Sequence, residues 1–353
     1  MGLWDRFLSA LLQKPRASIP PTRANSAAPT DHPNAVALLK DGSRSSSVGE
    51  AADWWVLPEP GSTLPVAPHR PELSAESRAI ENTLVSHFDG HDLTLPAMPV
   101  APDRVLRELR RTDCDFADVA QLISEDQVLT AAVLRTANSP FYRAGSPITS
   151  IKVAVPRLGI RTLRTLMMHV ALQSATLATR GCDRRRAEAL CSRALAGALI
   201  MEALAPLVGI DEEDAFLLGL LHDIGNIVVL RIASTDHAGQ PAAISDEEFE
   251  FLCYEAHQEF GELVANAWKL PERVTAVIRQ HHSPPAPDDP LRRERWAVML
   301  SDMICAMLGY APREAYEILD GLPARNLDLL ANPAWPAFLK RLPTHVEQML
   351  ESA

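Results

Sequence analysis

Apolar residues recur at steps of three and four along almost the whole chain from residue 80 to residue 353. One series is Val105, Leu106 and Leu109, and another begins at Leu129 and continues with Ala132. This spacing places the apolar side chains on one face of an α-helix. No Asn-Gly or Asp-Gly hairpin turn lies between alternating apolar residues, which would be the usual sign of paired strands. The sequence therefore predicts an all-α fold for this part of the chain.

Residues 1–80 differ in composition from the rest. They contain 10 Pro and 10 Ser, and few apolar residues in any regular period. Such a segment buries too little surface to offset the entropy lost on ordering, so we predict a disordered arm. A short amphipathic helix is expected at residues 3–13, where Pro15 ends it. We assign residues 81–310 to the folded domain and residues 311–353 to a helical C-terminal extension.

Charge and cysteine content indicate which partners and which cellular compartment suit the chain. The net charge of -11 argues against nucleic acid and anionic lipid as partners, because both are negatively charged. Its five cysteines form no CxxC pair, which favours a reducing compartment. No run of about 20 apolar residues is present, so no membrane span is predicted. Arginine far outnumbers lysine, as in proteins from GC-rich bacterial genomes, and we predict a cytoplasmic bacterial protein.

Residues 215–230 form the most apolar segment, yet they contain His222 and Asp223. Because the segment is apolar all round, its helix should lie at the centre of a core. A buried histidine and a buried aspartate must be paired, hydrogen-bonded or bound to a metal. The sequence therefore predicts a polar site inside the helical core.

Titratable side chains also lie among apolar residues in three later helical stretches. His257, His281 and Asp302 each fall on an apolar stripe, and His282 follows directly. Such ligands converging from separate helices are how helical proteins build metal sites. The six candidate residues are His222, Asp223, His257, His281, His282 and Asp302. They would either hold a divalent metal (Fe, Mn, Ni or Zn) that activates water, or form a hydrogen-bonded network that fixes the packing.

Several motifs resemble one known family. Residues 219–225, with the sequence GLLHDIG, resemble the signature of the HD phosphohydrolase superfamily. The later histidines follow in the order seen in HD-GYP and HDOD (HD-related output domain) proteins. Residues 95–99 resemble the entry segment of HDOD domains, and the run LRTANSP at residues 134–140 resembles part of an HDOD block that HD-GYP proteins lack. The resemblance covers about 60% of the chain and implies a two-lobed HDOD domain, with lobes at about 90–190 and 190–310, the second of them HD-like.

The resemblance also bears on catalysis. Catalytic HD enzymes carry a further histidine on the helix before the HD pair, and Cys191 stands where that residue is expected. The GYP tripeptide is absent after Gly261. HDOD domains are viewed as non-catalytic modules that transmit signals, so the resemblance implies a degenerate metal site that needs no cofactor. If a metal is retained, the six candidate residues would be its ligands.

Other polar features have structural or binding interpretations. Asn138 and Ser139 follow an apolar helix, which favours a structural corner over a ligand surface. Arginines at positions 157, 161 and 164 and at positions 184–186 form two basic clusters, which leaves a nucleotide ligand open.

We predict a non-catalytic regulatory protein of bacterial signal transduction that acts through other signalling proteins. The alternative is a metal-dependent phosphohydrolase or phosphodiesterase acting on a nucleotide or cyclic dinucleotide.

Overall fold

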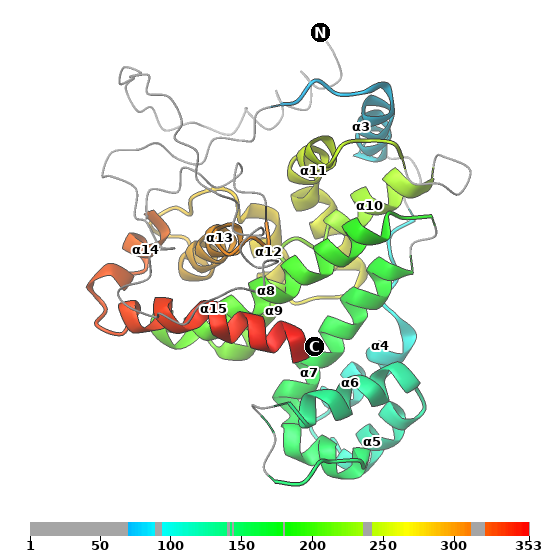
Figure 1. The fold of residues 1–353 in the computed structure, drawn as a ribbon, viewed down its shortest axis with the longest axis vertical. Helices are drawn as coiled ribbons and strands as arrows, with labels where there is room; N and C mark the ends of the chain where they lie inside the picture. The colour runs from blue at the N-terminus through cyan, green and yellow to red at the C-terminus, as the bar shows by residue number, and fades with distance from the viewer. Residues whose placement is uncertain are drawn as a thin grey trace, which may run out of the picture.

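The computed structural model describes residues 70–88, 94–139, 142, 145–178, 181–235, 242–311 and 322–352. All regular structure in these ranges is helical, which confirms the all-α prediction (Figure 1). Most of the predicted arm, including the short helix at residues 3–13, lies outside the described residues. Residue 80, the predicted end of the arm, falls inside the helix α3 (Ala75–Phe88), which packs against α10 and α11.

The N-terminal lobe lies at the bottom of Figure 1. It contains α4 (Val100–Leu109), α5 (Phe116–Ser124), α6 (Gln127–Ala137) and the start of α7 (Ile151–Leu177). Aspartate side chains cap two of these helices: Asp115 accepts from the N–H of Ala117, and Asp126 accepts from the N–H groups of Val128 and Leu129. These bonds satisfy backbone donors that a helix start leaves without partners.

Asn138 joins α6 to the segment that precedes α7. Its side-chain oxygen accepts from the N–H of Ile148 at 2.7 Å. Its side-chain amide donates to the carbonyl oxygens of Ile148 at 2.7 Å and Leu134 at 2.8 Å. The prediction of a structural corner at this position is confirmed, because both ends of the amide are used in backbone contacts.

The helix α7 runs from the N-terminal lobe into the C-terminal lobe and is broken at Gly159. This glycine has φ 75° and ψ 168°, a backbone conformation outside the helical region that glycine adopts easily. Beyond the break, Arg161 pairs with Asp211 at 3.1 Å and Arg164 donates to the carbonyl oxygen of Leu109 at 2.6 Å. This basic stripe therefore connects the two lobes.

The C-terminal lobe is built around α8. Its members are α8 (Arg184–Val208), α9 (Glu212–Leu221), α10 (Asn226–Thr235), α11 (Asp246–Ala267), α12 (Glu272–Gln280) and α13 (Arg292–Met307). The helices α8 and α9 cross in backbone contact, because a Cβ atom added at Gly219 would overlap the carbonyl oxygen of Gly197. Trp268 Nε1 donates to the carbonyl oxygen of Pro96 at 2.8 Å, which holds the entry segment of the domain against this lobe.

The apolar segment at residues 215–230 is buried as predicted but is not one helix. Helix α9 ends at Leu221, residues 222–225 form a turn, and α10 begins at Asn226. Gly225 packs so closely on α11 that an added Cβ would overlap the carbonyl oxygen of His257. The expectation of a continuous helix was wrong because this contact between helices decides the backbone here.

Among the described residues, two helical stretches match a membrane span in length and composition, Arg184–Val208 and Glu212–Ser234. Of their most apolar windows, 67% and 83% respectively are buried inside the protein. Such burial is what the core helices of a folded domain show. The cytoplasmic location stays a prediction.

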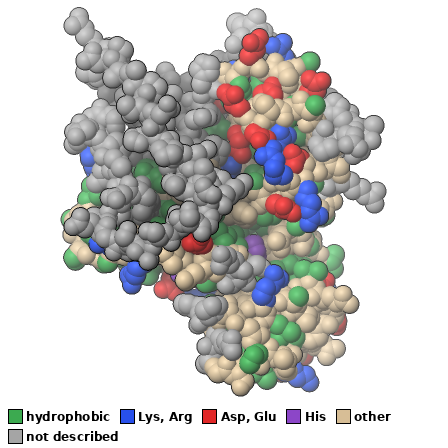
Figure 2. Space-filling model, in the orientation of Figure 1, with side chains coloured by type: hydrophobic (Ala, Val, Ile, Leu, Met, Phe, Trp, Pro, Cys, Tyr) green, Lys and Arg blue, Asp and Glu red, His purple; other side chains and the backbone are tan. Residues whose placement is uncertain are grey.

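The chain after α13 continues with α14 (Leu322–Asn326), the short 3-10 helix η1 (Leu329–Ala331) and α15 (Trp335–Ser352). Helix α15 lies along α8, and its residues Leu342 and Val346 are buried (Figure 1). On the face shown in Figure 2, acidic and basic side chains lie next to one another over the region of α3 and α11.

Glu248 of α11 is hydrogen-bonded to the residue that precedes α3, and we expect it to stabilise the fold. Its carboxylate accepts from the backbone N–H of Ser245, completing a capping box, and from the N–H of Ser74. Burial raises the pKa of Glu248, but these N–H donors outweigh the burial and lower the pKa from 4.5 to about 2. The lowered pKa means that Glu248 stabilises the fold fully above pH 4.5 and loses this contribution as the pH falls towards 2.

We expect Glu248→Gln to lower the free energy of unfolding by about 1.5 to 3 kcal/mol at pH 7. The difference between wild type and variant should shrink at pH 3. Urea unfolding at the two pH values measures both effects, and Glu247→Gln, at an exposed position in the same turn, is the control. An equal difference at pH 7 and pH 3 would contradict the assignment.

Candidate metal centre

Four parts of the C-terminal lobe supply the six predicted site residues. His222 and Asp223 lie in the turn between α9 and α10, and His257 lies on α11. His281 and His282 follow α12, and Asp302 lies on α13. The structure brings all six together, although they span 81 residues of the chain.

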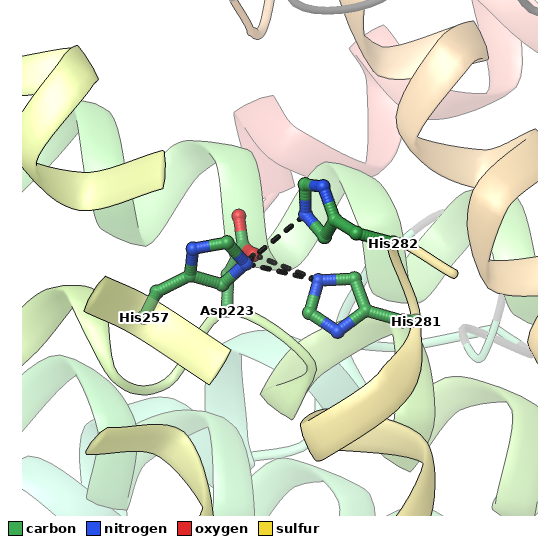
Figure 3. Close-up of side chains that lie close together, drawn as sticks. All are labelled: Asp223, His257, His281 and His282. Atoms are coloured by element: carbon green, nitrogen blue, oxygen red, sulfur yellow. Dashed lines mark hydrogen bonds and ion pairs between the residues drawn. The ribbon is translucent and has the colours of Figure 1, made fainter. Parts of the chain in front are cut away.

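Three imidazole nitrogens surround one carboxylate in the main group (Figure 3). Asp223 Oδ1 lies 3.4 Å from His257 Nε2 and 3.6 Å from His281 Nε2. His257 Nε2 also lies 3.1 Å from the Nε2 atoms of His281 and His282. All these ligand atoms lie within 4.8 Å of one another.

A second group, made by His222, His281 and Asp302, adjoins the first. His222 Nε2 lies 2.8 Å from Asp302 Oδ1 and 3.6 Å from Asp223 Oδ1. Although the distance to Asp302 is short, the buried Nε2 atom has no hydrogen bond of acceptable geometry. This nitrogen and the carboxylates together form a strongly polar position inside the core.

In three of these rings, the other nitrogen, Nδ1, is hydrogen-bonded to a backbone carbonyl oxygen. His222 Nδ1 is 3.0 Å from the carbonyl oxygen of Gly219, His257 Nδ1 is 2.8 Å from that of Cys253, and His281 Nδ1 is 2.7 Å from that of Ile278. A carbonyl oxygen only accepts, so each Nδ1 carries the proton. In the neutral rings Nε2 is then a lone pair, and the lone pairs of His257 and His281 face each other. Such an arrangement needs a cation between them, either a proton or a metal ion.

Burial and neighbouring charges shift the pKa values of these groups in different directions. Burial lowers the pKa of His257 to about 4, only partly opposed by Asp223, and it lowers the pKa of His282 well below its ordinary value. Burial also disfavours charge on His222, but the carboxylates of Asp302 and Asp223 raise its pKa to about 10. Burial disfavours the charged form of Asp223 too, yet the neighbouring histidines hold its pKa well below 3.8. At neutral pH the imidazoles of His257 and His282 are thus neutral beside the carboxylate of Asp223.

These residues fit a divalent first-row metal. Imidazole nitrogens and carboxylate oxygens are the donors that such ions accept, and each Nδ1–H bond to a carbonyl group is the usual support of a ligating histidine. Metal–ligand bonds of about 2.1 Å in tetrahedral geometry separate ligand atoms by roughly 3.4 Å. Four of the six separations in the main group, at 3.1 to 3.6 Å, agree with this value, and the other two are within 4.8 Å.

Cys191 does not join the cluster. It lines a separate pocket together with His169. Three residues of α8 line a small cavity together with Asp223: Leu190, Arg193 and Ala194. The side of α8 that faces Asp223 therefore carries Leu190, Arg193 and Ala194, and Cys191 faces the other pocket.

Arg193 is the residue near the site that the sequence reasoning missed. Its side chain is 12% exposed and forms a two-bond ion pair with Glu250, at 2.8 and 2.9 Å. The available signal was an arginine within an alanine-rich apolar helix, since such a charge needs a partner when buried.

The basic clusters noted in the sequence are occupied by acidic and backbone partners. Arg185 and Arg186 both pair with Asp246, and Arg184 pairs with Glu188. Together with the intermixed charges in Figure 2, these pairs give no support to a nucleic-acid surface on the described residues.

A helical lobe in which an HD pair meets histidines and an aspartate from three further helical segments defines a domain of the HD superfamily type. The family model described as HDOD domain matches residues 95–284. This match covers more than half of the chain, so the protein belongs to the HDOD domain family and the resemblance seen in the sequence is confirmed.

Solved structures share the fold. A candidate metal-dependent phosphohydrolase from Shewanella amazonensis SB2B is 21% identical, with a TM-score of 0.57, over 77% of this chain and 100% of its own. An HDOD domain protein of unknown function from Geobacter sulfurreducens is 24% identical, with a TM-score of 0.51, over 74% of this chain and 96% of its own. At these identities the likeness shows the fold alone.

A curated relative comes from Treponema pallidum (strain Nichols), where it is called an uncharacterized protein. It is 26% identical over 237 residues, which are 64% of this chain and 44% of the relative. The present chain therefore spans less than half the length of that protein.

Proposed function

We propose that this HDOD protein is a regulatory protein that acts through other signalling proteins and catalyses no bond cleavage. In this proposal the His/Asp cluster holds a divalent metal as a structural centre of the C-terminal lobe. The observation that carries the proposal is the burial of most of the cluster, in which only Asp223 and His282 are partly exposed. The side chains of His257, His281 and Asp223 are 3%, 0% and 12% exposed.

The cavity that Asp223 lines supports the same proposal. Its volume is about 20 Å³, and its other walls are mainly apolar, with Leu172, Leu190 and Ile227 among them. A water molecule needs roughly 10–15 Å³ of such volume, whereas small-molecule pockets are typically about 300–1,000 Å³. The cavity thus suits one water molecule and is far too small for a nucleotide. Arg193 adds a permanent positive charge to its wall, which disfavours a further metal ion there.

The alternative function is a metal-dependent phosphohydrolase. The convergence of three imidazole nitrogens on one carboxylate favours it, since a metal held there would make bound water acidic enough to attack a phosphodiester. The candidate phosphohydrolase from Shewanella amazonensis shares the fold. Under this alternative, Asp223 would orient the metal, and the helices around the cluster would have to open to admit substrate.

Metal content and hydrolysis, measured on the same preparations, separate the two functions. The protein is purified without a metal-affinity tag, and Fe, Mn, Ni and Zn are quantified by elemental mass spectrometry. We expect about one metal ion per chain, lost in Asp223→Ala and kept in Asp113→Ala, where an exposed aspartate is replaced. Cleavage of bis(p-nitrophenyl) phosphate and cyclic dinucleotides should not exceed the level of Asp223→Ala. Hydrolysis that Asp223→Ala abolishes and Asp113→Ala keeps would establish the phosphohydrolase instead.

A further inference from the structure

A second pocket lies on the opposite side of α8 from the cavity beside Asp223. It forms where the C-terminal half of α15 meets α7 and α8, near the chain end marked C in Figure 1. Its volume is about 410 Å³, which is within the range of small-molecule sites. The lining residues are His169, Gln173, Cys191, Ser192, Leu195, Tyr310, Glu347 and Leu350.

His169 is the residue of this pocket that the fold does not explain. It is only 9% exposed, and its Nδ1 atom is buried without a hydrogen-bond partner. A buried polar atom without a partner costs the free energy of its lost hydration, about 1–3 kcal/mol, so proteins rarely keep one without a use. Burial, together with the nearby charge of Arg135, lowers the pKa of His169 to about 4. The ring is therefore neutral at pH 7 and offers one N–H donor and one lone pair.

The rest of the lining selects an uncharged ligand. Burial raises the pKa of the Cys191 thiol to about 11, so it stays protonated. Leu195 and Leu350 provide apolar surface, and Tyr310 provides an aromatic ring. None of the eight lining residues is cationic at neutral pH, and Glu347 adds a negative charge that repels phosphates and carboxylates.

We propose that this pocket binds a small uncharged nitrogen heterocycle of nucleobase or nucleoside size, with His169 hydrogen-bonding to its donor–acceptor edge. A flat ring would lie between the apolar side chains and the tyrosine, and a turn of the His169 ring about its Cβ–Cγ bond would bring the buried Nδ1 atom, which has no partner, towards the polar edge of the ligand. The pocket is distinct from the His/Asp cluster, so this proposal does not depend on the function proposed for that cluster.

Calorimetric titration of the full chain with adenine, hypoxanthine, adenosine, guanosine, cytidine and uridine tests the proposal. AMP and inorganic phosphate serve as anionic comparisons. We expect at least one uncharged probe to bind, and binding to weaken about tenfold or more in His169→Leu. His345→Leu, which replaces a histidine of α15 that lines a different pocket, should bind as the wild type does.

The melting temperature of the ligand-free variants distinguishes a loss of binding from a loss of folding. His169→Leu removes an unpartnered polar atom, so its melting temperature should equal or exceed that of the wild type. A fall of several degrees would assign His169 a structural role and overturn the proposal. It is equally overturned if no uncharged probe binds, if His169→Leu binds as tightly as the wild type, or if AMP binds while adenosine does not.

Discussion

Replacing Gly225 by alanine is expected to prevent stable folding of the C-terminal lobe. The added methyl group would overlap three backbone atoms of α11: the carbonyl oxygen and carbon of His257 and the nitrogen of Gly261. Backbone atoms inside a packed helix pair cannot move aside as a flexible side chain can, so α10 and α11 would have to separate. We expect a loss of about 3 kcal/mol or more in the free energy of unfolding, or failure to obtain soluble protein.

Urea unfolding followed by circular dichroism measures this effect. Gly145→Ala is the matched control, because Gly145 has φ 99° but an added Cβ there meets no atom within 4 Å. It should lose only about 1 kcal/mol, the cost of its positive φ. A Gly225→Ala protein as stable as Gly145→Ala would show that the turn does not touch α11.

The second large effect concerns His222 in chelator-treated protein. His222→Ala removes the cationic partner of the buried carboxylates of Asp302 and Asp223. Removing one member of a buried ion pair typically costs about 3–5 kcal/mol, because the remaining charge has lost both water and partner. We expect a loss of stability in this range and no loss of catalytic activity.

A double-mutant cycle with Asp302→Ala isolates the pair. The double variant should lose less stability than the sum of the two single losses, because the second substitution removes the charge that the first left without a partner. Urea unfolding of the four proteins at pH 7 gives the coupling free energy. Strictly additive losses would mean that His222 and Asp302 do not stabilise each other.

Much of the fold could be predicted from local pattern. The steps of three and four in α4 and α6 are properties of the helices themselves, and each helix buries the residues so spaced. The six site residues were detectable for a related reason. A charged or titratable side chain on an apolar stripe is costly unless it has a partner, so its presence in the sequence points to a buried site.

Two features depended on contacts that the sequence does not display. The break after Leu221 interrupts a segment whose local pattern favours a continuous helix, and the approach of Gly225 to His257 decides it. The second feature is the helical phase of α8. Positions two apart differ by about 200° around a helix, so Cys191 and Arg193 lie on opposite sides even though they are close in sequence. An error of two residues in aligning α8 with the family motif therefore moves the expected position from the cavity beside Asp223 to the pocket beside His169.

The glycine crossing of α8 and α9 has a mechanical consequence. Where two helices touch through their backbones at Gly197 and Gly219, no side chain lies between them that could change rotamer and absorb a displacement. The two helices should therefore move as one rigid unit, together with their residues that lie beside Asp223. Any large displacement between the lobes then has to be taken up outside this pair. Gly159, where α7 leaves helical geometry between the lobes, is a position at which the backbone has the freedom to bend.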